Sequence, residues 1–593
     1  MPSPHLVAAS ATRAPRAVTL TPAARRPPPR RRAPARSVSV SASASASAAR
    51  GPHAVPVPLP TTGPLAPPDD VREAVRAWPW RGGLEPCAER PVAPLPPDAI
   101  RGVIPPDLNG TFYRVGPGRV RVGARRYAHW FDGDGACFAI RLDGEAGAAS
   151  AGVRMVRTDR YVAQERAGVD AGVAVRGAWT QADDLFANLG RFPTNPGNTA
   201  PMFHAGRFLA LCEGGAPVEL DPITLETRGV FEFGPELPMG FSAHAKRDSR
   251  DGTLYTWGLA KPPAIGFKVA KIDASGAVEK VADLPLPGPG PRFTLIHDCA
   301  MSENHLVFIV PPWKLEPGGK MAAALLGASS FGHAFEWDDG AGAWMIVVRK
   351  SDLSVAHARE IPSMSTYHFA GAYETNADGS KSNGAPEEIR VLVNELIGRR
   401  DDLEARFADM YSAEWAPDGY NLLSEYTVRM RDGALVSKSP VVPRVPGGGE
   451  DVSVASAGQL PMEFPVIAPG ARRRKPRFVY TLGFAGSGSG YFDAVQRLDV
   501  RDGGTHQTRI MPPGVFPSEV EFVPRRDARG DVRESEEDRG YLIYLEYHAA
   551  RHQSDVVVLD AADVAGKELA RIKLPFHVPH TFHGTFRADR STR

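Results

Sequence analysis

The stretch TLYTWGLA, residues 253–260, shows the pattern that dominates the chain: a short run of β-branched, aromatic and aliphatic residues that soon ends. Similar runs are TFYRVG (111–116), RFLALCEG (207–214), HLVFIVPP (305–312), WMIVVRKSD (344–352), RFVYTLGF (477–484) and YLIYLEYH (541–548). Gly, Asp, Asn and Pro separate these runs, and Asp-Gly pairs such as those at 251–252 and 432–433 are typical of hairpin turns. Many short strands with frequent turns predict an all-β fold: a sandwich, a barrel or a propeller.

The length of the chain narrows this choice. Its 593 residues could hold several domains, but large all-β folds use such lengths as one unit. Because no linker interrupts the β-rich part, a propeller is favoured over a sandwich. The sequence shows no strict repeat of the WD or kelch kind, so these patterns do not set the number of blades.

The N-terminal segment has a composition of its own. Residues 1–68 contain no Asp or Glu, and they include RRPPPRRRAPAR (25–36) and SVSVSASASASAAR (37–50). A basic, acid-free segment rich in Ser and Ala predicts a disordered organelle transit peptide over residues 1–65. The alternative is a Pro/Arg-rich tail that binds an acidic partner. The next stretch, DVREAVRAWPWRG (70–82), predicts a short helix that Pro79 ends.

Charge, cysteines and hydropathy exclude several classes of site. The formal charge of +2 gives no reason to expect a nucleic acid partner. The four cysteines, Cys87, Cys137, Cys212 and Cys299, form no CxxC pair, which suits a reducing compartment and excludes a cysteine-based metal site. No apolar run approaches the roughly 20 residues of a membrane span. The longest, HLVFIVPPW (305–313) and MAAALLGASSF (321–331), belong either to the core or to a membrane-facing surface.

Three histidines stand close together in HVPHTFHGTF, residues 577–586. Pro575 and Pro579 exclude a regular helix there, so these histidines do not lie on one helical face. In an extended chain His577 and His583 point to one side and His580 to the other. Three neighbouring residues cannot then converge on one ion, and any metal site needs partners from distant parts of the sequence.

Three further histidines adjoin β-rich runs in separate parts of the chain. His244 lies in GFSAHAKRD (240–248), His297 in FTLIHDCAMSENHLVFI (293–309) and His368 in STYHFAGAYET (365–375). Taken singly, each reads as a structural or capping histidine rather than a metal ligand.

A series of motifs changes that interpretation. In chain order they are LNGTFYRVGPGR (108–119), HWFDGDG (129–135), NPGNTAPMFHAGRFLALCEGGAPVELDPITLETRG (195–229), FSAHAKRD (241–248), LIHDCAMSENHLVF (295–308), YHFAGAYE (367–374), MEFPVIAP (462–469) and FHGTF (582–586). Together they resemble, in the same order, the motifs of the carotenoid cleavage dioxygenase family, also called the carotenoid oxygenases. The resemblance covers about residues 84–587.

The resemblance implies a seven-bladed β-propeller over residues 66–593, with a dome of loops and helices above a metal on the propeller axis. It implies one Fe(II) ion held by His244, His297, His368 and His583, so that His577 and His580 are not ligands. It also implies three glutamates that orient these histidines, Glu213, Glu463 and Glu519. For the last of these, Glu521 is an alternative, because it lies two residues on and would share a strand face.

The activity implied by the resemblance is oxidative cleavage of a C=C double bond in a carotenoid or apocarotenoid, with O2 and a hydrophobic polyene as substrates. The plastid stroma, or a peripheral position on a thylakoid or plastoglobule, follows as the expected location. Phe131, Phe369, Phe464 and Phe582 are candidates for the wall of an apolar tunnel, or else ordinary core. The alternatives are a dioxygenase that cleaves stilbene-type phenylpropanoids and a non-catalytic propeller that binds an apolar ligand.

The chain departs from the family's usual residues at a few positions. Val466-Ile467-Ala468 replace the common Arg-Ile-Asn, and His580-Thr581 replace the common Tyr-Gly before the last histidine motif. Ala136 stands where a methionine is usual. None of these changes removes a predicted ligand, so the resemblance implies an effect on substrate selectivity rather than on metal binding.

Overall fold

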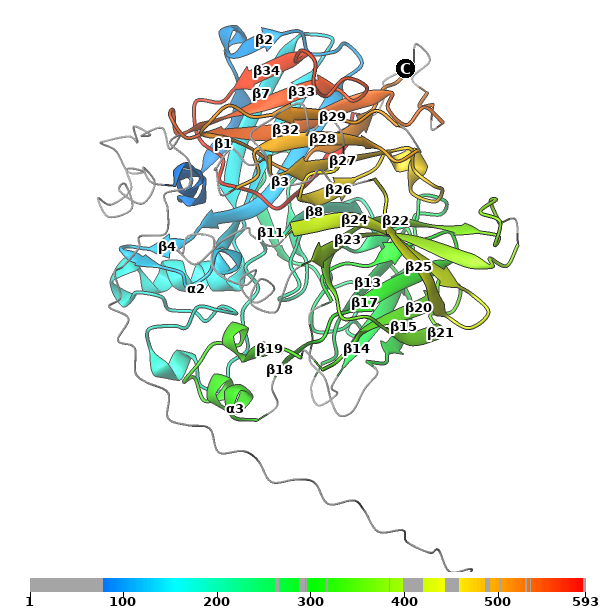
Figure 1. Ribbon diagram of the computed structural model, residues 1–593. Coiled ribbons are helices and arrows are strands. Elements are labelled where there is room, and N and C mark those ends of the chain that lie inside the picture. The colour runs from blue at the N-terminus through cyan, green and yellow to red at the C-terminus, as the bar shows by residue number, and fades with distance from the viewer. Residues whose placement is uncertain are drawn as a thin grey trace, which may run out of the picture. The chain divides into compact units, whose positions relative to one another are not determined.

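The computed structural model describes most of the chain beyond residue 77, within one structural unit, Gly51–Arg593 (Figure 1). The described residues are 78–589 without 262–265, 287–293, 295, 316–317, 339, 383, 398–419, 443–457, 486–490, 502–503, 528–530 and 534. The predicted transit peptide, residues 1–65, lies outside them, as do residues 66–77 of the predicted domain.

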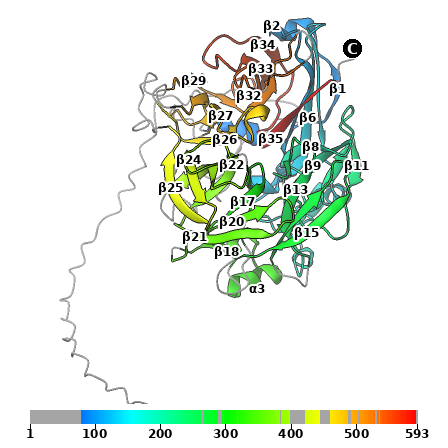
Figure 2. The same ribbon diagram turned by 90° about the vertical axis from the view of Figure 1, so that its right-hand side faces the viewer.

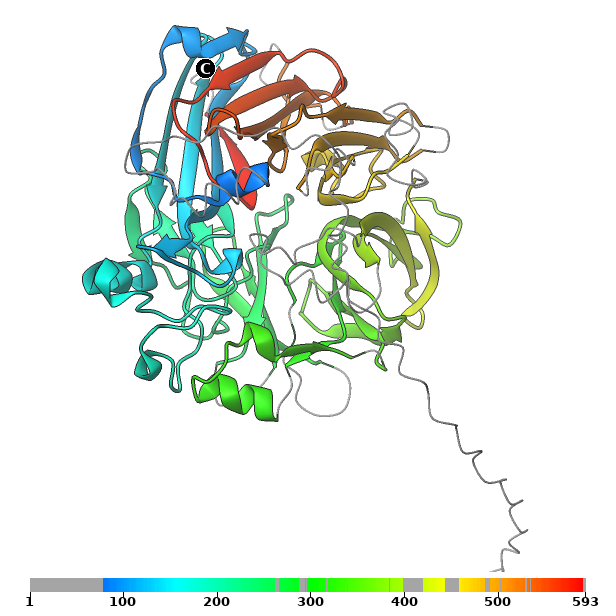
Figure 3. The same cartoon turned by 60° about the vertical axis from the view of Figure 1, so that its left-hand side comes forward.

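Seven antiparallel sheets of four to six strands form the fold, and they are arranged as the blades of a β-propeller. In Figure 3 the colours pass in chain order from blade to blade around a common centre. End strands of several neighbouring sheets contact each other: β35 contacts β8, β16 contacts β22, β22 contacts β26 and β31 contacts β35. These end strands therefore surround the axis. The predicted all-β, seven-bladed propeller is confirmed.

The first four blades run in chain order. Blade 1 contains β1 (Arg90–Pro94), β7 (Ala148–Met155), β6 (Asp134–Asp143), β3 (Asn109–Arg119) and β35 (His583–Ala588). Blade 2 contains β11 (Thr227–Val230), β10 (Val218–Leu220), β9 (Arg207–Leu211) and β8 (Ala200–His204). Blade 3 contains β12 (Lys246–Arg247), β13 (Leu254–Leu259), β14 (Phe267–Ile272) and β15 (Val278–Leu284). Blade 4 contains β16 (Ala300–Met301), β17 (His305–Val310), β20 (Ala343–Arg349) and β21 (Val355–Ile361).

The last three blades follow the same order. Blade 5 contains β22 (Ser365–Thr375), β23 (Glu388–Ile397), β24 (Tyr420–Arg429) and β25 (Ala434–Pro440). Blade 6 contains β26 (Met462–Val466), β27 (Phe478–Gly483), β28 (Ala494–Asp499) and β29 (Gln507–Ile510). Blade 7 contains β2 (Ile100–Gly102), β34 (Ala570–Lys573), β33 (Gln553–Asp560), β32 (Gly540–His548), β30 (Val515–Pro517) and β31 (Glu521–Pro524).

The position of a strand within its blade explains its composition. The middle strands β17, β27 and β28 are buried along their whole length, because a neighbouring blade covers each face of their sheet. In β17 and β27 this burial goes with nearly continuous apolar runs, whereas β28 carries the buried polar side chains Gln496, Arg497 and Asp499. The outer strands β15 and β25 are largely exposed and correspondingly polar.

The two ends of the described chain close the ring of blades. The C-terminal strand β35 pairs with β3 of blade 1, with His583 opposite Val115, and Figure 2 shows red β35 beside the blue strands of that blade. Near the other end of the chain, β2 pairs with β34 of blade 7. This exchange fixes a residue only ten positions from the end of the chain, His583, at the propeller axis.

Two insertions between strands build the dome. The first, residues 156–199, carries α2 (Asp159–Ala167), η4 (Val169–Ala171) and η5 (Leu185–Ala187). The second, residues 311–342, carries β18 (Trp313–Leu315), α3 (Gly319–Leu325), η6 (Gly332–Ala334) and β19 (Phe335–Trp337). The remaining short elements are η2 (Pro97–Ala99), β4 (Arg121–Val122), β5 (Arg125–Arg126), η3 (Trp130–Asp132) and η7 (Pro469–Ala471).

The segment before β1 is described from Trp78 onward, so residues 70–77 of the predicted short helix lie outside the described residues. Pro79 begins the 3-10 helix η1 (Pro79–Leu84), where a missing backbone N–H and a fixed φ are well tolerated. The segment is held by two histidines near the C-terminus. His580 Nε2 donates to the carbonyl of Trp80 at 2.9 Å, and His577 Nε2 donates to that of Glu85 at 3.2 Å. His577 and His580 thus hold the N-terminal segment and are not grouped with the four histidines predicted as ligands.

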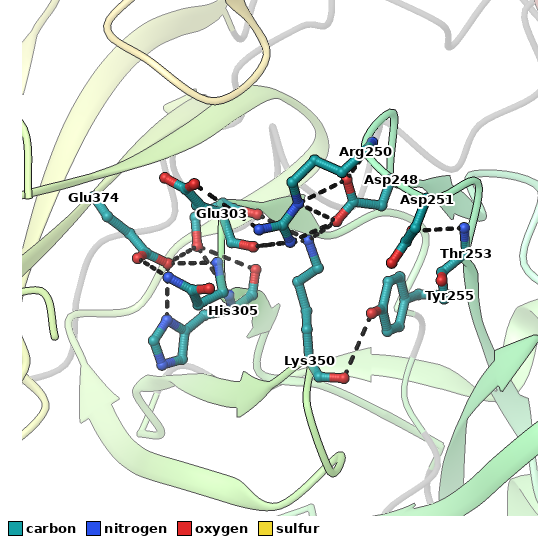
Figure 4. Close-up of polar contacts among 11 residues, drawn as sticks. Asp248, Arg250, Asp251, Thr253, Tyr255, Glu303, His305, Lys350 and Glu374 are labelled. Atoms are coloured by element: carbon teal, nitrogen blue, oxygen red, sulfur yellow. Dashed lines mark hydrogen bonds and ion pairs between the residues drawn. The ribbon is translucent and has the colours of Figure 1, made fainter. Parts of the chain in front are cut away.

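A buried polar network joins blades 3, 4 and 5 (Figure 4). Lys350 donates to Asp248 at 2.5 Å across blades 3 and 4, and His305 Nδ1 lies 2.9 Å from Glu374 Oε1 across blades 4 and 5. Burial alone would raise the pKa of Glu374, but hydrogen bonds from His305, Ser302 and Asn304 lower it to about 2. The network therefore stabilises the interfaces between these blades, and it contains none of the four histidines predicted as ligands.

The lowered pKa values of three buried histidines predict that the stability of the fold depends on pH. Burial lowers the pKa of His552 to about 3, of His577 to about 4 and of His580 to about 3. An unfolded histidine titrates near pH 6.5, so their contribution is complete above that pH and is lost as the pH falls toward 4. We expect each to reduce the unfolding free energy by up to about 1.4 kcal/mol per pH unit in this window. Urea denaturation at pH 7 and pH 5 measures the loss; an unchanged pH dependence in a His577→Gln/His580→Gln variant would contradict it.

Candidate metal centre

Four histidines from four different blades converge at the axis. His244 directly precedes β12, His297 precedes β16, His368 lies within β22, and His583 begins β35. One ring nitrogen from each lies within 4.8 Å of the other three. Within the described residues this is the one group of three or more His, Cys, Asp or Glu side chains able to hold a metal ion. The structure thus brings together the four histidines predicted as ligands.

The three remaining blades each supply a carboxylate. Glu213 follows β9 of blade 2, Glu463 lies in β26 of blade 6, and Glu519 lies between β30 and β31 of blade 7. Their oxygens lie 2.6 Å from His297 Nδ1, 2.6 Å from His368 Nδ1 and 3.0 Å from His583 Nδ1, respectively. Every blade therefore places one polar side chain at the axis, either a histidine or a glutamate.

The structure distinguishes between Glu519 and Glu521. Glu519 contacts His583, whereas Glu521 accepts a hydrogen bond from the backbone N–H of Phe586 at 3.1 Å. Burial and the neighbouring Glu519 raise the pKa of Glu521 to about 7. Of the two, Glu519 is thus the carboxylate that contacts His583, the position that the resemblance implied.

Burial sets the electrostatics of the histidine group. It lowers the pKa of His244 well below its ordinary value, and the three other histidines lower it further. It also lowers the pKa of His583. For His368 burial acts in the same direction, but the Glu463 carboxylate outweighs it and the pKa is raised. Neutral imidazoles facing one another are the form in which histidine binds metal ions.

The donor set fits a divalent transition-metal ion. In three of the rings a carboxylate occupies Nδ1, which fixes the tautomer and leaves Nε2 to face the centre. His368 Nε2 is buried and has no hydrogen-bond partner. The Nε2 atoms of His244 and His297 face each other at 2.9 Å. Imidazole nitrogens suit Fe, Zn, Cu and Ni, so the donors alone do not select one of these metals.

Aromatic rings surround the histidine group. Phe464 lies 5.1 Å from His368 and 5.3 Å from His583, between ring centroids. Phe582 lies 5.5 Å from Phe131. Phe464 has a φ of 56°, a left-handed conformation that costs a non-glycine residue on the order of 1–3 kcal/mol and is often found at functional sites. These three predicted wall residues belong to or pack against one apolar cluster, and Phe464 is the one with ring contacts to the histidines.

The fourth predicted wall residue has a different position. Phe369 packs in the apolar cluster between blades 4 and 5, and it also lines a cavity of about 1390 Å³ that reaches His244 and His583. Two aromatic residues near the centre were not predicted. Tyr367 lies 5.6 Å from His297, and Trp179 of the dome lies 5.6 Å from Phe131. Tyr367 precedes a predicted ligand, but no sequence signal placed Trp179 there.

Glu213 offers a direct test of the carboxylate partners. Burial raises its pKa, but His297 at 2.6 Å outweighs this and lowers it, which keeps the group ionised. We expect Glu213→Gln to weaken metal affinity or turnover about 10–100-fold, as is typical for residues that orient a ligating histidine. Titration of the metal-free protein with Fe(II) or Co(II) measures the affinity. Unchanged affinity and turnover would show that Glu213 does not support the centre.

Comparisons with known proteins agree with this geometry. A family model described as retinal pigment epithelial membrane protein matches residues 84–588. An apocarotenoid-15,15'-oxygenase from Synechocystis is 28% identical over 82% of this chain and 92% of its own length. A resveratrol cleavage oxygenase from Chaetomium globosum is 26% identical, over 82% and 84%. A 9-cis-epoxycarotenoid dioxygenase from Oryza sativa, named as chloroplastic, is 29% identical, over 84% and 74%.

A solved structure extends the similarity to three dimensions. The cobalt-substituted apocarotenoid oxygenase of Synechocystis is similar with a TM-score of 0.70 and 26% identity, over 86% of this chain and 98% of that one. The family match spans nearly all of the propeller, and the fold agrees over a similar share of the chain. The chain therefore belongs to the family of the retinal pigment epithelial membrane protein, which is the carotenoid oxygenase family.

Proposed function

We propose that this chain is a non-haem Fe(II) dioxygenase that cleaves a C=C double bond of a carotenoid or apocarotenoid into two carbonyl products. The observation that carries the proposal is the axial group of four histidines with a carboxylate behind three of them. Within the family, carotenoid and apocarotenoid cleavage are the activities named for similar proteins.

Two groups of residues would have different roles in this activity. His244, His297, His368 and His583 would hold the iron, and Glu213, Glu463 and Glu519 would keep three of the rings oriented. When bound, iron supplies the chemistry that adds both atoms of O2 across one double bond. An all-imidazole set adds no negative charge, so the ionised carboxylates behind the rings moderate the charge of the ion.

The aromatic wall would select the bond. Phe464 lies beside two of the histidines, and Phe131 and Phe582 contact each other in the same apolar cluster. Such rings would exclude water and position a flat conjugated chain by ring contact. The distance from these rings to the end of the bound substrate would then fix which double bond lies at the metal.

Product analysis tests the proposal. Purified, iron-loaded protein is incubated with carotenoids, apocarotenals and stilbenes, and the aldehydes are identified by mass. We expect paired carbonyl products from a carotenoid or apocarotenoid, and their masses give the bond. Cleavage of stilbenes alone would overturn the carotenoid assignment and leave the metal site intact.

A second candidate function is the cleavage of a stilbene-type phenylpropanoid. It is supported by the similarity to the resveratrol cleavage oxygenase of Chaetomium globosum. It also fits the departures Val466-Ile467-Ala468, of which Val466 and Ile467 line the cavity that reaches His244 and His583. The third alternative, a non-catalytic propeller, gains no support, because the similar proteins are named as cleavage enzymes and all four axial histidines are present.

The N-terminal segment supports a plastid location. Residues 1–68 lack acidic side chains and are rich in Ser, Ala and Arg, as transit peptides are. The similar dioxygenase from Oryza sativa is named as chloroplastic. We expect residues 1–65 fused to a fluorescent reporter to direct it into plastids of a plant or algal cell. Cytosolic fluorescence would contradict this location.

An apolar rim on the dome supports a peripheral position on a membrane. The rim consists of Leu185, Phe186, Leu189, Phe192, Leu325 and Leu326, each 37–77% exposed. Its two segments are joined where the backbone N–H of Gly190 donates to the carbonyl of Leu325 at 2.8 Å. Of the predicted stretch 321–335, Leu325 and Leu326 are exposed, whereas Phe331 is buried.

A series of contacts leads from this rim to Phe131, one of the predicted wall residues. Phe192 of the rim stacks on Phe331 at 5.6 Å, and Gly332 binds the backbone of the dome at Ala178, next to Trp179. Trp179 in turn contacts Phe131 of the wall. An apolar substrate dissolved in a bilayer would therefore meet apolar side chains from the surface inward. Within the described residues no helix is long and apolar enough to span a membrane.

Charge placed on the rim tests this surface. We expect Phe186→Asp/Leu326→Asp to lose co-sedimentation with thylakoid-lipid vesicles and to retain turnover of a detergent-solubilised apocarotenoid. Ile223→Asp is the matched control, because Ile223 is as exposed as Phe186, at 77%, but lies on blade 2. Equal vesicle binding by both variants would show that the rim does not dock.

A further inference from the structure

Arg114 is a fully buried cation next to the metal centre. It lies in the middle of β3, opposite Gly584 of the closing strand β35, and its exposure is 0%. Burying a guanidinium is costly unless each charged donor is paired, so its contacts indicate what it does.

All of its side-chain hydrogen bonds go to two short segments at the axis. On blade 7, Nη1 donates to Glu519 Oε2 at 2.8 Å and to the Glu519 carbonyl at 3.2 Å. On the segment that leads into β35, Nη2 donates to the Phe582 carbonyl at 2.8 Å and Nε donates to Thr581 Oγ1 at 2.9 Å. One planar side chain thus joins the carboxylate partner of His583 to the two residues that precede His583.

The contact with Glu519 leads directly to the metal ligand. Glu519 uses one oxygen for His583 Nδ1 at 3.0 Å and the other for Arg114 and the backbone N–H of Gly584. Rotation of the carboxylate away from His583 would break both contacts of the second oxygen. Arg114 therefore restricts Glu519 to the orientation that holds the imidazole.

The same side chain reaches the aromatic wall. Phe582, whose carbonyl it holds, has ring contacts with Trp130 at 4.4 Å and with Phe131 at 5.5 Å. The Thr581 hydroxyl that accepts from Nε exists because this chain has threonine where the family commonly has glycine. A fixed backbone at 581–583 places the wall ring and the ligand together.

Glu463 and Glu519 differ in the partner of their second carboxylate oxygen. The oxygen of Glu463 that is not bound to His368 accepts from the neutral amide of Asn421 at 2.7 Å. Glu519 instead shares its charge with a buried cation. His583 is thus oriented by a group whose charge is partly offset, which makes it a less strongly polarised ligand than His368.

We propose that Arg114 is a positioning residue of the metal centre, which sets His583 through Glu519 and sets the wall ring through Thr581 and Phe582. The proposal rests on the proposed metal site and adds a residue that does not touch the metal. A guanidinium is needed, because an ammonium cannot make hydrogen bonds in these fixed directions from one plane.

Cobalt binding to the metal-free full-length protein gives the test, since the visible absorption of Co(II) reports ligand geometry without turnover. We expect Arg114→Lys to bind Co(II) about 10–100-fold more weakly and with an altered spectrum. Arg571→Lys is the matched control, because Arg571 is also largely buried and pairs with Glu546, Asp555 and Glu568 on the outer part of blade 7. It should bind Co(II) like the wild type.

A double variant shows whether Arg114 acts through Glu519. We expect Arg114→Lys/Glu519→Gln to lose less Co(II) affinity than the sum of the two single losses, because both changes break the path through Glu519. Additive losses, or wild-type affinity and spectrum in Arg114→Lys, would overturn the proposal.

If Arg114→Lys does not fold, Thr581→Val gives the test. A change of the Co(II) spectrum from that of the wild type, smaller than a change of a ligand would cause, supports the role of Arg114. An unchanged spectrum overturns it. Failure of the wild type to bind any metal would instead overturn the metal site itself.

Discussion

Replacing His297 or His583 with alanine is expected to abolish double-bond cleavage and to lower bound iron to a small fraction of the wild-type content. Each removes one of four nitrogens that lie within 4.8 Å of one another, and it also leaves Glu213 or Glu519 without its imidazole partner. A buried carboxylate without its partner is costly, so the remaining three histidines would not be held as before. Metal analysis and product detection by mass measure the two losses.

The neighbouring histidines are the matched controls. His577 and His580 lie in the same segment as His583, but their Nε2 atoms donate to the carbonyls of Glu85 and Trp80. His577→Ala and His580→Ala should therefore retain iron, although both lose stability. Full activity of His583→Ala, or loss of iron from both controls, would show that the terminal histidines form a local site instead.

The four histidines that meet at the axis could be predicted because each lies within a recognisable motif. Their convergence could not be derived from spacing alone, since it depends on seven blades that share one axis. The family resemblance supplied that geometry. The placement of Glu213, Glu463 and Glu519 behind three of the rings agrees with what the resemblance implied.

The doubt between Glu519 and Glu521 shows where a strand rule fails. Residues two apart share a face only within a strand. β31 begins at Glu521, and Glu519 belongs to the irregular connection from β30. The two carboxylates therefore have different neighbours, and one sequence pattern could not separate them.

Other features depend on contacts between distant segments. The guanidinium of Arg114 binds residues more than 400 positions away, and the dome brings Trp179 to the wall without any local motif. A 3-10 helix that begins at Pro79 was not predicted either, although proline is well tolerated at a first helical position.

The last prediction concerns where the folded part of the chain begins. We expect a chain starting at residue 66 to fold and bind metal, because the acid-free segment before it has the composition of sequence that cannot form a core. A chain starting at residue 86 should not fold. It lacks η1, whose Trp80 and Leu84 are 3% and 1% exposed and pack in the apolar cluster that contains Phe582.

The size of the effect follows from this burial. Loss of a buried tryptophan and a buried leucine costs about 3–5 and 2–5 kcal/mol, and the net stability of a domain is on the order of 5–15 kcal/mol. The truncation also leaves His577 and His580 buried without the carbonyls that they bind. Circular dichroism and iron content compare the two chains. A soluble, iron-binding protein that starts at residue 86 would show that η1 is dispensable.

Gly83→Ala tests the same segment within the full chain. A Cβ at this position would lie 2.3 Å from His580 Nε2, so the imidazole must leave the carbonyl that it binds or η1 must shift. We therefore expect a lower denaturation midpoint. Because His580 lies three residues before His583, metal affinity should also fall if η1 braces the closing strand. A variant with an unchanged midpoint would show that η1 only rests on the propeller.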